Sequence, residues 1–251
     1  MYQNERWNEI LRQLKKYGFV TVKYLVETLH YSNATINRDL NALEGQGLVK
    51  RSYGGVELSA EANSATPLPF RYHKMRSEKL KIGKAAADLI KDFDVVFIDG
   101  STTSESMAEF IAEKKSVTVV TNNMALVSFL SELGVKAFCL GGYVKEAPSM
   151  LGGAQTVENA AQYHYDKMFF SSGYFSEEGE IGSSETYYLL HKTAAAHADE
   201  VYYLADHSKT VRPKHSWRIL FDFSRVSGVI SDYHFSEAVK AKYPKTAFIK
   251  P

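Results

Sequence analysis

The sequence predicts two domains of different fold class, a small helical domain at the N-terminus and a larger α/β domain with a mostly parallel open sheet. Apolar residues recur with the spacing of amphipathic helices up to Leu43, whereas from Val95 onward short β-rich runs alternate with helical segments. Between these parts, residues 59–76 are rich in alanine, serine and proline and then become basic, which is typical of a linker. We therefore expect domains at residues 1–58 and 77–251, joined by a linker at 59–76.

Three groups of apolar residues in the first domain have the spacing of one helix face. They are Trp7, Ile10, Leu11 and Leu14; Val22, Leu25, Val26 and Leu29; and Ile36, Leu40 and Leu43. Gly18 should end the first helix, because glycine is common just after a helix. Ser32 should begin the third, since its hydroxyl can accept a hydrogen bond from an amide of the first turn.

The third helix and the basic segment after it indicate a winged helix-turn-helix. The outward side chains of the helix are amides and a guanidinium, groups that suit adenine, guanine or phosphate. A hairpin that turns at Gly54-Gly55 would lie along a phosphate backbone. The expected DNA contacts are Ser32, Asn33, Thr35, Asn37, Arg38, Asn41, Lys50, Arg51 and Tyr53. The alternative is a three-helix unit that binds another protein.

Charge is divided unevenly along the chain. The formal net charge of the whole chain is +1, but residues 1–81 hold 13 lysines and arginines against 8 aspartates and glutamates. Residues 82–251 hold 17 against 21, so the two parts carry +5 and −4. The basic surplus lies with the predicted DNA-binding domain, as a phosphate partner favours.

The composition argues against several other classes of protein. The one cysteine, Cys139, lies in an apolar run, and we expect its side chain to be buried rather than reactive. Eight histidines are scattered without metal-ligand spacing, so we expect neither a metal nor a cofactor. No apolar run approaches the roughly 20 residues of a membrane span, and we expect a soluble, cytoplasmic protein.

The second domain should alternate strands and helices. The predicted strands are residues 95–98, 117–120, 137–140, 168–170, 201–204, 228–230 and 247–249. The predicted helices begin at Ser77 and then occupy residues 103–111, 124–133, 156–163, 187–198 and 235–241. Because the strand runs are apolar throughout, they predict a largely parallel sheet that is covered by helices on both faces.

Polar residues follow these strands, where the carboxyl ends of parallel strands form ligand sites. Hydroxyls after Gly100 fall at a helix start, where partial positive charge suits a phosphate or carboxylate; simple helix capping is the alternative. Lys209 adds a cation, although an Asp-x-x-Lys sequence is more often a surface ion pair. The expected ligand contacts are Asp99, Gly100, Ser101, Thr102, Thr103, Thr121, Asn122, Asn123, Gly141, Gly142, Gly152, Asp206 and Lys209.

These residues resemble the DeoR family of bacterial transcriptional regulators over residues 5–249. In the first domain the matching segments are Thr35-Ile36-Asn37-Arg38-Asp39-Leu40, Gly47-Leu48, Tyr53-Gly54-Gly55-Val56 and Glu78-Lys79 at the entry to the second. In the second they are Asp99-Gly100-Ser101-Thr102-Thr103, Thr121-Asn122, Gly141-Gly142, Gly152 and Ala205-Asp206-His207-Ser208-Lys209. The resemblance implies a winged helix-turn-helix joined to a sensor domain that is related in fold to ribose-phosphate isomerases and CoA transferases.

The resemblance also implies a repressor, occasionally an activator, of a sugar-catabolism operon, which responds on operator DNA to a phosphorylated sugar or a related effector. Two departures from the family pattern concern its contacts. The family commonly has two consecutive arginines where this chain has Asn37-Arg38, which should alter base preference or phosphate contact. Where many members carry an acidic residue, this chain has Tyr187 and apolar neighbours with Glu185 nearby, which bears on the effector.

A catalytic alternative follows from the relation of this fold to enzymes. An isomerase needs a positioned base, and a CoA transferase needs a carboxylate nucleophile; Glu185, Asp99 and Asp206 could supply either. None of them stands in a paired-carboxylate or Ser/His pattern. We therefore expect a non-enzyme that binds operator DNA as a homodimer or homotetramer, and the alternative is a sugar-phosphate isomerase-like enzyme with an N-terminal interaction module.

Overall fold

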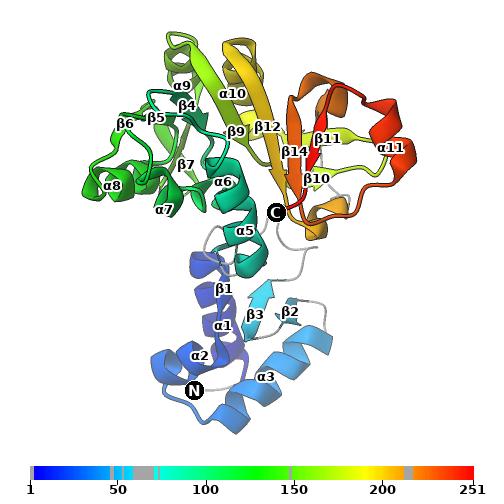
Figure 1. The fold of residues 1–251 in the computed structure, drawn as a ribbon. Helices are drawn as coiled ribbons and strands as arrows, with labels where there is room; N and C mark the ends of the chain where they lie inside the picture. Colours follow the sequence, from blue (N-terminus) through cyan, green and yellow to red (C-terminus); the bar gives the residue numbers. More distant parts are fainter. Residues whose placement is uncertain are drawn as a thin grey trace. The chain divides into compact units, whose positions relative to one another are not determined.

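The computed structural model describes residues 3–45, 48–52, 54–58, 71–72, 74–146, 149–211 and 217–251. The chain forms two compact units, Met1–Lys74 and Met75–Pro251, each with its own hydrophobic core (Figure 1). Most of the expected linker, at residues 59–70 and 73, lies outside the described residues.

The N-terminal unit is a winged helix-turn-helix. Within its described residues it contains helices α1 Gln3–Tyr17, α2 Val22–Leu29 and α3 Asn33–Gly45, and strands β1 Phe19–Val20, β2 Val49–Ser52 and β3 Gly55–Leu58. The strands pair antiparallel in the order β1-β3-β2. The three predicted helices and the hairpin are confirmed. Strand β1 was not predicted, because two residues are too few to show an alternating pattern.

Local chemistry sets the ends of these helices. Gly18 has a φ of 73°, and its amide donates to the carbonyl oxygen of Leu14 at 2.7 Å, which closes α1 as predicted. Thr21 caps α2 by accepting from the amide of Tyr24. Ser32 caps α3, because its hydroxyl accepts from the amide of Thr35 at 3.1 Å.

The C-terminal unit is built on a wholly parallel sheet, which confirms the predicted fold class. Within the described residues its strands are β4 Val95–Ile98, β5 Thr118–Thr121, β6 Lys136–Cys139, β9 Tyr165–Phe170, β12 Ala198–Ala205, β14 Gly228–Ser231 and β15 Ala247–Ile249. Their order is β15-β14-β12-β9-β4-β5-β6, and neighbours pair in parallel (Figure 1). The helices are α5 Arg76–Ala87, α6 Thr102–Glu105, α7 Ala108–Ile111, α8 Met124–Glu132, α9 Ala154–Ala160, α10 Glu185–Ala196 and α11 Glu237–Lys242.

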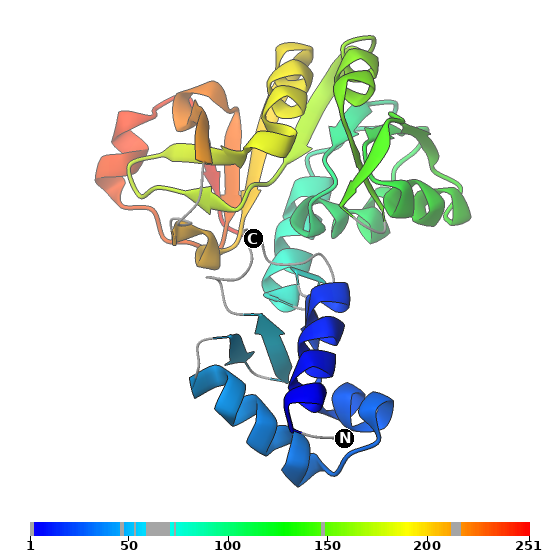
Figure 2. The ribbon, with the colours of Figure 1, turned by 180° about the vertical axis from the view of Figure 1, so that it is seen from behind.

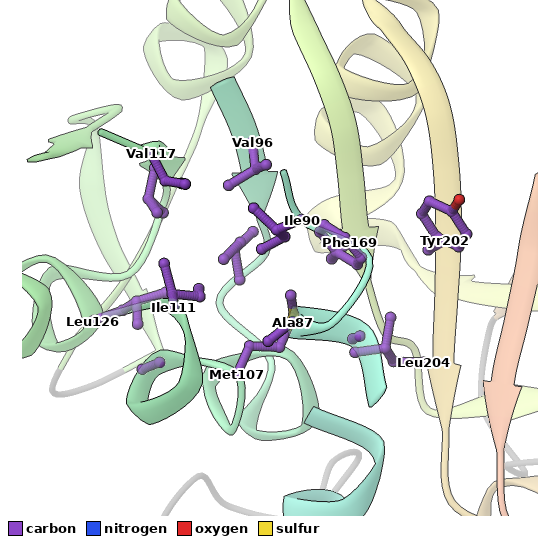
Figure 3. Packing of buried hydrophobic residues seen from close by; sticks show 14 of the residues in the cluster. Ala87, Ile90, Val96, Met107, Ile111, Val117, Leu126, Phe169, Tyr202 and Leu204 are labelled. Atoms are coloured by element: carbon purple, nitrogen blue, oxygen red, sulfur yellow. The ribbon is translucent and has the colours of Figure 1, made fainter. Parts of the chain in front are cut away.

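Both faces of the sheet are buried, which explains the apolar strand runs. On one face, Val96, Phe169 and Leu204 of the strands pack against residues from α5 to α8 (Figure 3). The helical residues of this cluster include Ile82, Ala86, Ala87, Ala108, Ile111, Leu126 and Leu130. On the other face, the ring of Phe170 lies 5.3 Å from that of His191 in α10, centre to centre. This packing holds the central strands in place, and because they are parallel, their carboxyl ends lie at one edge of the sheet.

Two antiparallel additions were not predicted from the sequence. One is the hairpin of β7 Tyr143–Glu146 and β8 Met150–Gly152. The other is the sheet β10-β11-β13, formed by Tyr174–Phe175, Glu180–Ser184 and Trp217–Asp222. Seen from behind in Figure 2, β10 and β11 lie in front of the parallel sheet, and the ring of Phe175 contacts Tyr203. Apart from β13, these strands have five residues or fewer, too few to show a clear alternating pattern.

Three expectations need correction. Cys139 is exposed rather than buried, because β6 is an edge strand of the parallel sheet and its outward residues are uncovered. The helix expected at residues 103–111 is divided into α6 and α7, where Ser106 donates to the carbonyl oxygens of Lys79 and Thr103. The helices expected at 156–163 and 187–198 begin two residues earlier, at Ala154 and Glu185. Ala198, expected in the second of these, begins β12.

Candidate DNA-binding surface and effector site

One face of α3 anchors the helix, and the other is exposed. Ile36, Leu40 and Leu43 are fully buried, as expected from their spacing. Asn33, Arg38 and Asn41 are exposed. Arg38 makes no hydrogen bond or ion pair with any described residue, so its guanidinium is available to an outside partner.

Asp39 holds α3 in place from the buried side. Its carboxylate is fully buried and accepts from Arg6 Nε at 2.6 Å and from Trp7 Nε1 at 3.0 Å, both on α1. This hydrogen bond and the charge of Asp39 raise the pKa of Arg6, although partial burial opposes the rise. In the sequence, Asp39 stands out only as part of the segment Thr35–Leu40 that resembles the family. Its position next to the apolar stripe residue Leu40 was the signal in the sequence, because a buried carboxylate needs a cation or hydrogen-bond donors from another segment.

Arg51 of β2 does not extend freely from the hairpin. Its guanidinium donates from Nη1 to Asn41 Oδ1 and from Nη2 to Asn37 Oδ1, both at 2.5 Å. Asn37 is half-buried, and its Nδ2 donates to the carbonyl oxygen of Asn33 at 2.9 Å and also to the Asn33 side chain. Four predicted DNA contacts, Arg51, Asn41, Asn37 and Asn33, are therefore joined to one another in this structure.

The other expected DNA contacts among the described residues belong to the start of α3 and to the hairpin. Ser32 and Thr35 share a hydrogen bond between their hydroxyls at 2.9 Å, at the first turn of α3. Lys50 is exposed on β2 and stands opposite Glu57 in the hairpin register. Tyr53 lies outside the described residues.

In the C-terminal unit, Asp99 stands at the carboxyl end of β4 and joins three elements. Its carboxylate accepts from the amides of Ser101 and Ser171, both at 3.2 Å, and lies 3.1 Å from His191 Nε2 on α10. Burial acts to raise the pKa of Asp99. The hydrogen bond and charge of His191, together with hydrogen bonds from Ser104 and Ser101, outweigh burial and hold this pKa below its ordinary value. His191 was not among the predicted site residues, because nothing in the chain pattern links it to Asp99.

The serine and threonine loop after Asp99 adjoins a buried lysine. Ser101 caps α6 by accepting from the amide of Ser104 at 3.1 Å, which is the alternative that the sequence left open for this loop. Thr102 Oγ1 accepts from Lys79 Nζ of α5 at 3.0 Å, and both side chains are buried. Lys79 was not among the expected ligand contacts, although the Glu78-Lys79 pair was part of the family resemblance.

The residues after β5 are buried and engaged within the protein. Asn122 accepts from the amide of Gly100 at 2.9 Å and donates to the carbonyl oxygen of Leu151 at 2.9 Å. Asn123 caps α8 and donates to Glu105, and Thr121 accepts from the amide of Asn123. These side chains hold the loop around Gly100 in place, and their polar groups bond to the protein itself rather than facing a ligand.

Three of the four glycines of the expected site, Gly141, Gly142 and Gly152, lie near the start of α9. Thr156 Oγ1 donates to the carbonyl oxygen of Gly141 at 2.7 Å. Gly142 has a φ of 109°, and a Cβ there would lie 2.7 Å from the carbonyl oxygen of Gly152, so only glycine fits without strain. Gly152 also lines a pocket of about 350 Å³ at the amino ends of α9 and α10, together with Glu158 and Glu185.

Asp206 and Lys209 meet the end of β9 from the other side. Asp206 is buried and accepts from the amide of Ser208 at 3.0 Å. Lys209 Nζ donates to the carbonyl oxygen of Ser172 at 2.8 Å, and the Ser172 hydroxyl lies 2.9 Å from that of Tyr203. Lys209 thus has a partner at the strand edge, and among the described residues no ion pair joins it to Asp206, which the sequence alone allowed.

Several buried polar atoms near the carboxyl edge of the parallel sheet have no hydrogen-bond partner among the described residues. Among the residues that the structure describes, Thr103 Oγ1, Ser171 Oγ and His191 Nδ1 are buried and have no hydrogen-bond partner. Thr103 and Ser171 follow β4 and β9, and His191 lies against Asp99. A buried polar atom without a partner costs about 1–3 kcal/mol, so these atoms favour a ligand or water that bonds to them.

Two kinds of feature are not found among the described residues. None of the helices in that part of the chain is long and apolar enough to cross a membrane. No group of three or more His, Cys, Asp or Glu residues there is placed to hold a metal ion.

Both units match family models. Residues 6–62 match the DeoR-like helix-turn-helix domain, and residues 74–233 match the DeoR C terminal sensor domain. A ribose 5-phosphate isomerase A from Methanocaldococcus jannaschii is 17% identical, with a TM-score of 0.41 over 55% of this chain and 56% of that one. At this level the likeness carries no inference about activity.

Similar regulators cover most of the chain. The HTH-type transcriptional repressor GlcR of Bacillus subtilis is 34% identical, over 83% of this chain and 81% of its own length. The lactose phosphotransferase system repressor of Streptococcus mutans is 31% identical, over 92% of this chain and 93% of its own length. The HTH-type transcriptional regulator FruR of Bacillus subtilis is 31% identical, over 83% of this chain and 84% of its own length. The chain belongs to the DeoR family of DNA-binding transcriptional regulators.

Proposed function

We propose that this protein represses a carbohydrate-catabolism operon, and that a phosphorylated sugar bound at the carboxyl edge of the parallel sheet changes its affinity for the operator. The observation that carries the regulatory role is the exposed face of α3, where Arg38 has no partner among the described residues while the opposite face is anchored by Asp39. The names of the similar proteins, which include lactose phosphotransferase system repressors, support a sugar operon.

On the DNA side, Arg38 and Lys50 have different roles. Arg38 lies on the exposed face of α3 and contacts a base edge in the major groove. Lys50 lies in the hairpin and contacts phosphate, which carries no sequence information. The amides and hydroxyls of Ser32, Asn33, Thr35, Asn37 and Asn41 line the same surface.

Two variants test this assignment. Arg38→Ala should weaken operator binding by about 1–3 kcal/mol, while its affinity for unrelated DNA falls less. Lys50→Ala should weaken binding to every sequence alike and reduce the slope of log affinity against log salt by about one. Fluorescence anisotropy with operator and scrambled duplexes measures both. Wild-type affinity in both variants would contradict this docking.

On the effector side, Asp99 follows β4 and Asp206 follows β12. At the same edge of the sheet, Lys79 and Lys209 provide two cations, which contact Thr102 and Ser172. A phosphate between them exchanges their present oxygen partners, Thr102 Oγ1 and the Ser172 carbonyl, for charge-assisted hydrogen bonds. The carboxylates of Asp99 and Asp206 accept from sugar hydroxyls in this arrangement. The unpartnered atoms of Thr103, Ser171 and His191 add hydrogen bonds that only a bound ligand or water supplies.

Regulation follows from differential binding. An effector that prefers one state of the protein shifts the population toward it, and operator DNA must shift effector affinity by the same factor in return. We propose a homodimer or homotetramer in which paired recognition helices read half-sites one helical turn, or a multiple, apart. Sedimentation with and without operator tests this assembly, and a monomer on DNA would contradict it.

A thermal-shift screen identifies the effector. Phosphorylated sugars and polyol phosphates are added to the full chain, and a ligand of the folded state raises the melting temperature by an amount that grows with the logarithm of its concentration relative to its Kd. The matching unphosphorylated sugars serve as controls. A shift from the free sugar alone would contradict the phosphate part of the proposal.

The alternative of a sugar-phosphate enzyme is disfavoured by one observation. Glu185 lies two positions before Tyr187 in the sequence, where this chain departs from the family pattern. Its carboxylate is exposed and lies 3.1 Å from Arg218, so it is not a buried base. Incubation of the pure protein with the ligand found in the screen should leave the ligand unchanged by mass spectrometry or NMR. Turnover at a useful rate would replace the regulatory proposal with an enzymatic one.

A further inference from the structure

We propose that Arg51 is a positioning residue that sets the base preference of the recognition helix by fixing the orientation of Asn41 and Asn37. This inference rests on the proposed DNA-binding function and deepens it. The sequence placed Arg51 on the phosphate backbone, but its guanidinium is bonded to the recognition surface instead.

The three asparagines form one row along α3. Asn33, Asn37 and Asn41 follow each other at intervals of four residues, so they share a helix face. Arg51 bridges the last two, and Asn37 Nδ2 reaches the carbonyl oxygen of Asn33. The backbone of Arg51 is fixed as well, because its amide donates to Glu44 Oε1 of α3 at 2.8 Å. Strand β2 is thereby joined to α3 at both the main chain and the side chain.

The chemistry of arginine determines which way these amides face. A guanidinium has only donors, so the atom that it contacts in each asparagine must be the carboxamide oxygen. With Oδ1 of Asn41 held by Arg51, the Nδ2 group of this exposed side chain remains to face DNA. Asn37 is engaged at both its oxygen and its nitrogen, so it supports the row rather than reading a base.

This orientation favours one class of base edge. Reading adenine with an asparagine requires the oxygen to accept from N6 while the nitrogen donates to N7. Because Arg51 occupies one lone pair of Oδ1 and holds that oxygen toward β2, Asn41 presents mainly its Nδ2 donors, which suit acceptor edges, namely N7 and O6 of guanine or O4 of thymine. The structure thus assigns Asn41 to an acceptor-bearing base and Arg51 to the task of keeping it so.

The experiment separates positioning from phosphate contact. Binding sites are selected from a randomised operator library with the wild type, Arg51→Lys, Asn41→Ala and the double variant, and Lys50→Ala is the matched hairpin control. Arg51→Lys keeps the positive charge but loses the planar fork whose two separate nitrogens reach Asn41 and Asn37. It should relax the preference at the one base pair per half-site that also depends on Asn41, by roughly 10-fold, and leave the salt dependence unchanged.

The double variant should show no further relaxation beyond Asn41→Ala, because both changes remove the same contact. Lys50→Ala should lower binding to all sites without changing any base preference. Circular dichroism and melting temperatures establish that each variant is folded.

Three results would overturn the inference. Arg51→Lys could keep the wild-type base preference and lose affinity for all sequences alike, which would make Arg51 a backbone contact. Replacing adenine by 7-deazaadenine or by purine at the position that depends on Asn41 could each weaken wild-type binding, which would show a bidentate adenine contact through N7 and N6. Alternatively, Asn41→Ala could leave every preference intact. A wild-type protein that binds no duplex, even at low salt, would instead refute the proposed function itself.

Discussion

The two ends of the parallel sheet both hold a buried acidic residue beside a basic one, but they use them differently. At the amino end, Asp94 lies 2.7 Å from Lys167 Nζ and also accepts from the amide of Lys91. At the carboxyl end, Asp99 lies 3.1 Å from His191 Nε2, but His191 Nδ1 and the nearby Ser171 hydroxyl have no partner among the described residues.

This difference separates structure from function. Where every buried polar group has its partner, the arrangement stabilises the fold and leaves nothing for a ligand. Where buried polar groups of the described residues have no hydrogen-bond partner, the folded state carries an unfavourable desolvation free energy, which a bound ligand can offset by bonding to them. The comparison predicts that substitutions at the amino end change stability, whereas substitutions at the carboxyl end change the response to effector.

The largest expected effect is at Lys167. Lys167→Met should lower the free energy of unfolding by about 3–5 kcal/mol, because it leaves the Asp94 carboxylate buried without its cation. Urea denaturation followed by circular dichroism measures the loss. Adding Asp94→Asn should recover part of it, since the uncompensated charge is then gone. A loss below about 1 kcal/mol in the single variant would show that this pair is not structural.

The second effect is at Lys79, where binding should change more than stability. Lys79→Met should weaken binding of the effector found in the thermal-shift screen by about 1.5–3 kcal/mol, because a charge-assisted hydrogen bond to phosphate is lost. Isothermal titration measures the affinity. Lys81→Met, an exposed position on the same helix, is the matched control and should bind effector normally. Equal affinities in the two variants would remove Lys79 from the site.

The third prediction compares one serine at each end of the sheet. Ser171→Ala should leave stability nearly unchanged, because its hydroxyl has no partner within the described residues, and should weaken effector binding by about 0.5–1.5 kcal/mol. Ser227→Ala removes the acceptor of the Val201 amide, which lies 3.0 Å away, and should instead cost about 1 kcal/mol of stability. The opposite pattern would break the comparison.

The smallest expected effect is a pH dependence of the loop that carries Lys209. His207 Nδ1 lies 2.5 Å from Asp232, and this hydrogen bond raises the pKa of His207 above its ordinary value of 6.5, although partial burial opposes the rise. The stabilising charge is therefore fully present below pH 6.5 and is lost as pH rises through the raised pKa. Because the pair is half exposed, solvent screening keeps the effect small.

Effector affinity measured at several pH values tests this dependence. The wild type should bind slightly more weakly as pH rises through the raised pKa of His207, and His207→Gln should remove that component. The phosphate's own ionisation is the same for both proteins, so their ratio isolates the histidine. A ratio that does not change with pH would contradict the prediction.

Much of the fold could be predicted because short-range patterns carry it. The buried residues Ile36, Leu40 and Leu43 follow helical spacing, and the run at Val95–Ile98 forms a strand with the predicted limits. The sheet additions β10, β11 and β13 could not be predicted, since their stability comes from packing such as that of Phe175 on Tyr203. Cys139 shows the same limit, because an apolar strand does not reveal whether it lies at the edge of its sheet.

The candidate sites divide in the same way. The sequence indicated Arg38 and Lys209 by residue type and position. It did not indicate that Arg51 holds Asn41, or that Lys79 reaches Thr102, because each pair joins residues that are at least ten positions apart. Such contacts depend on the packing of one element against another.

By itself, the sequence determined two domains, the helical spacing of the first, the apolar strands of the second and the basic surplus of the N-terminal part, since each follows from residue type and local periodicity. Tertiary structure alone decided which polar side chains are already satisfied and which remain for a partner. Hydrogen bonds between distant segments make that distinction, and they exist only after the chain has folded.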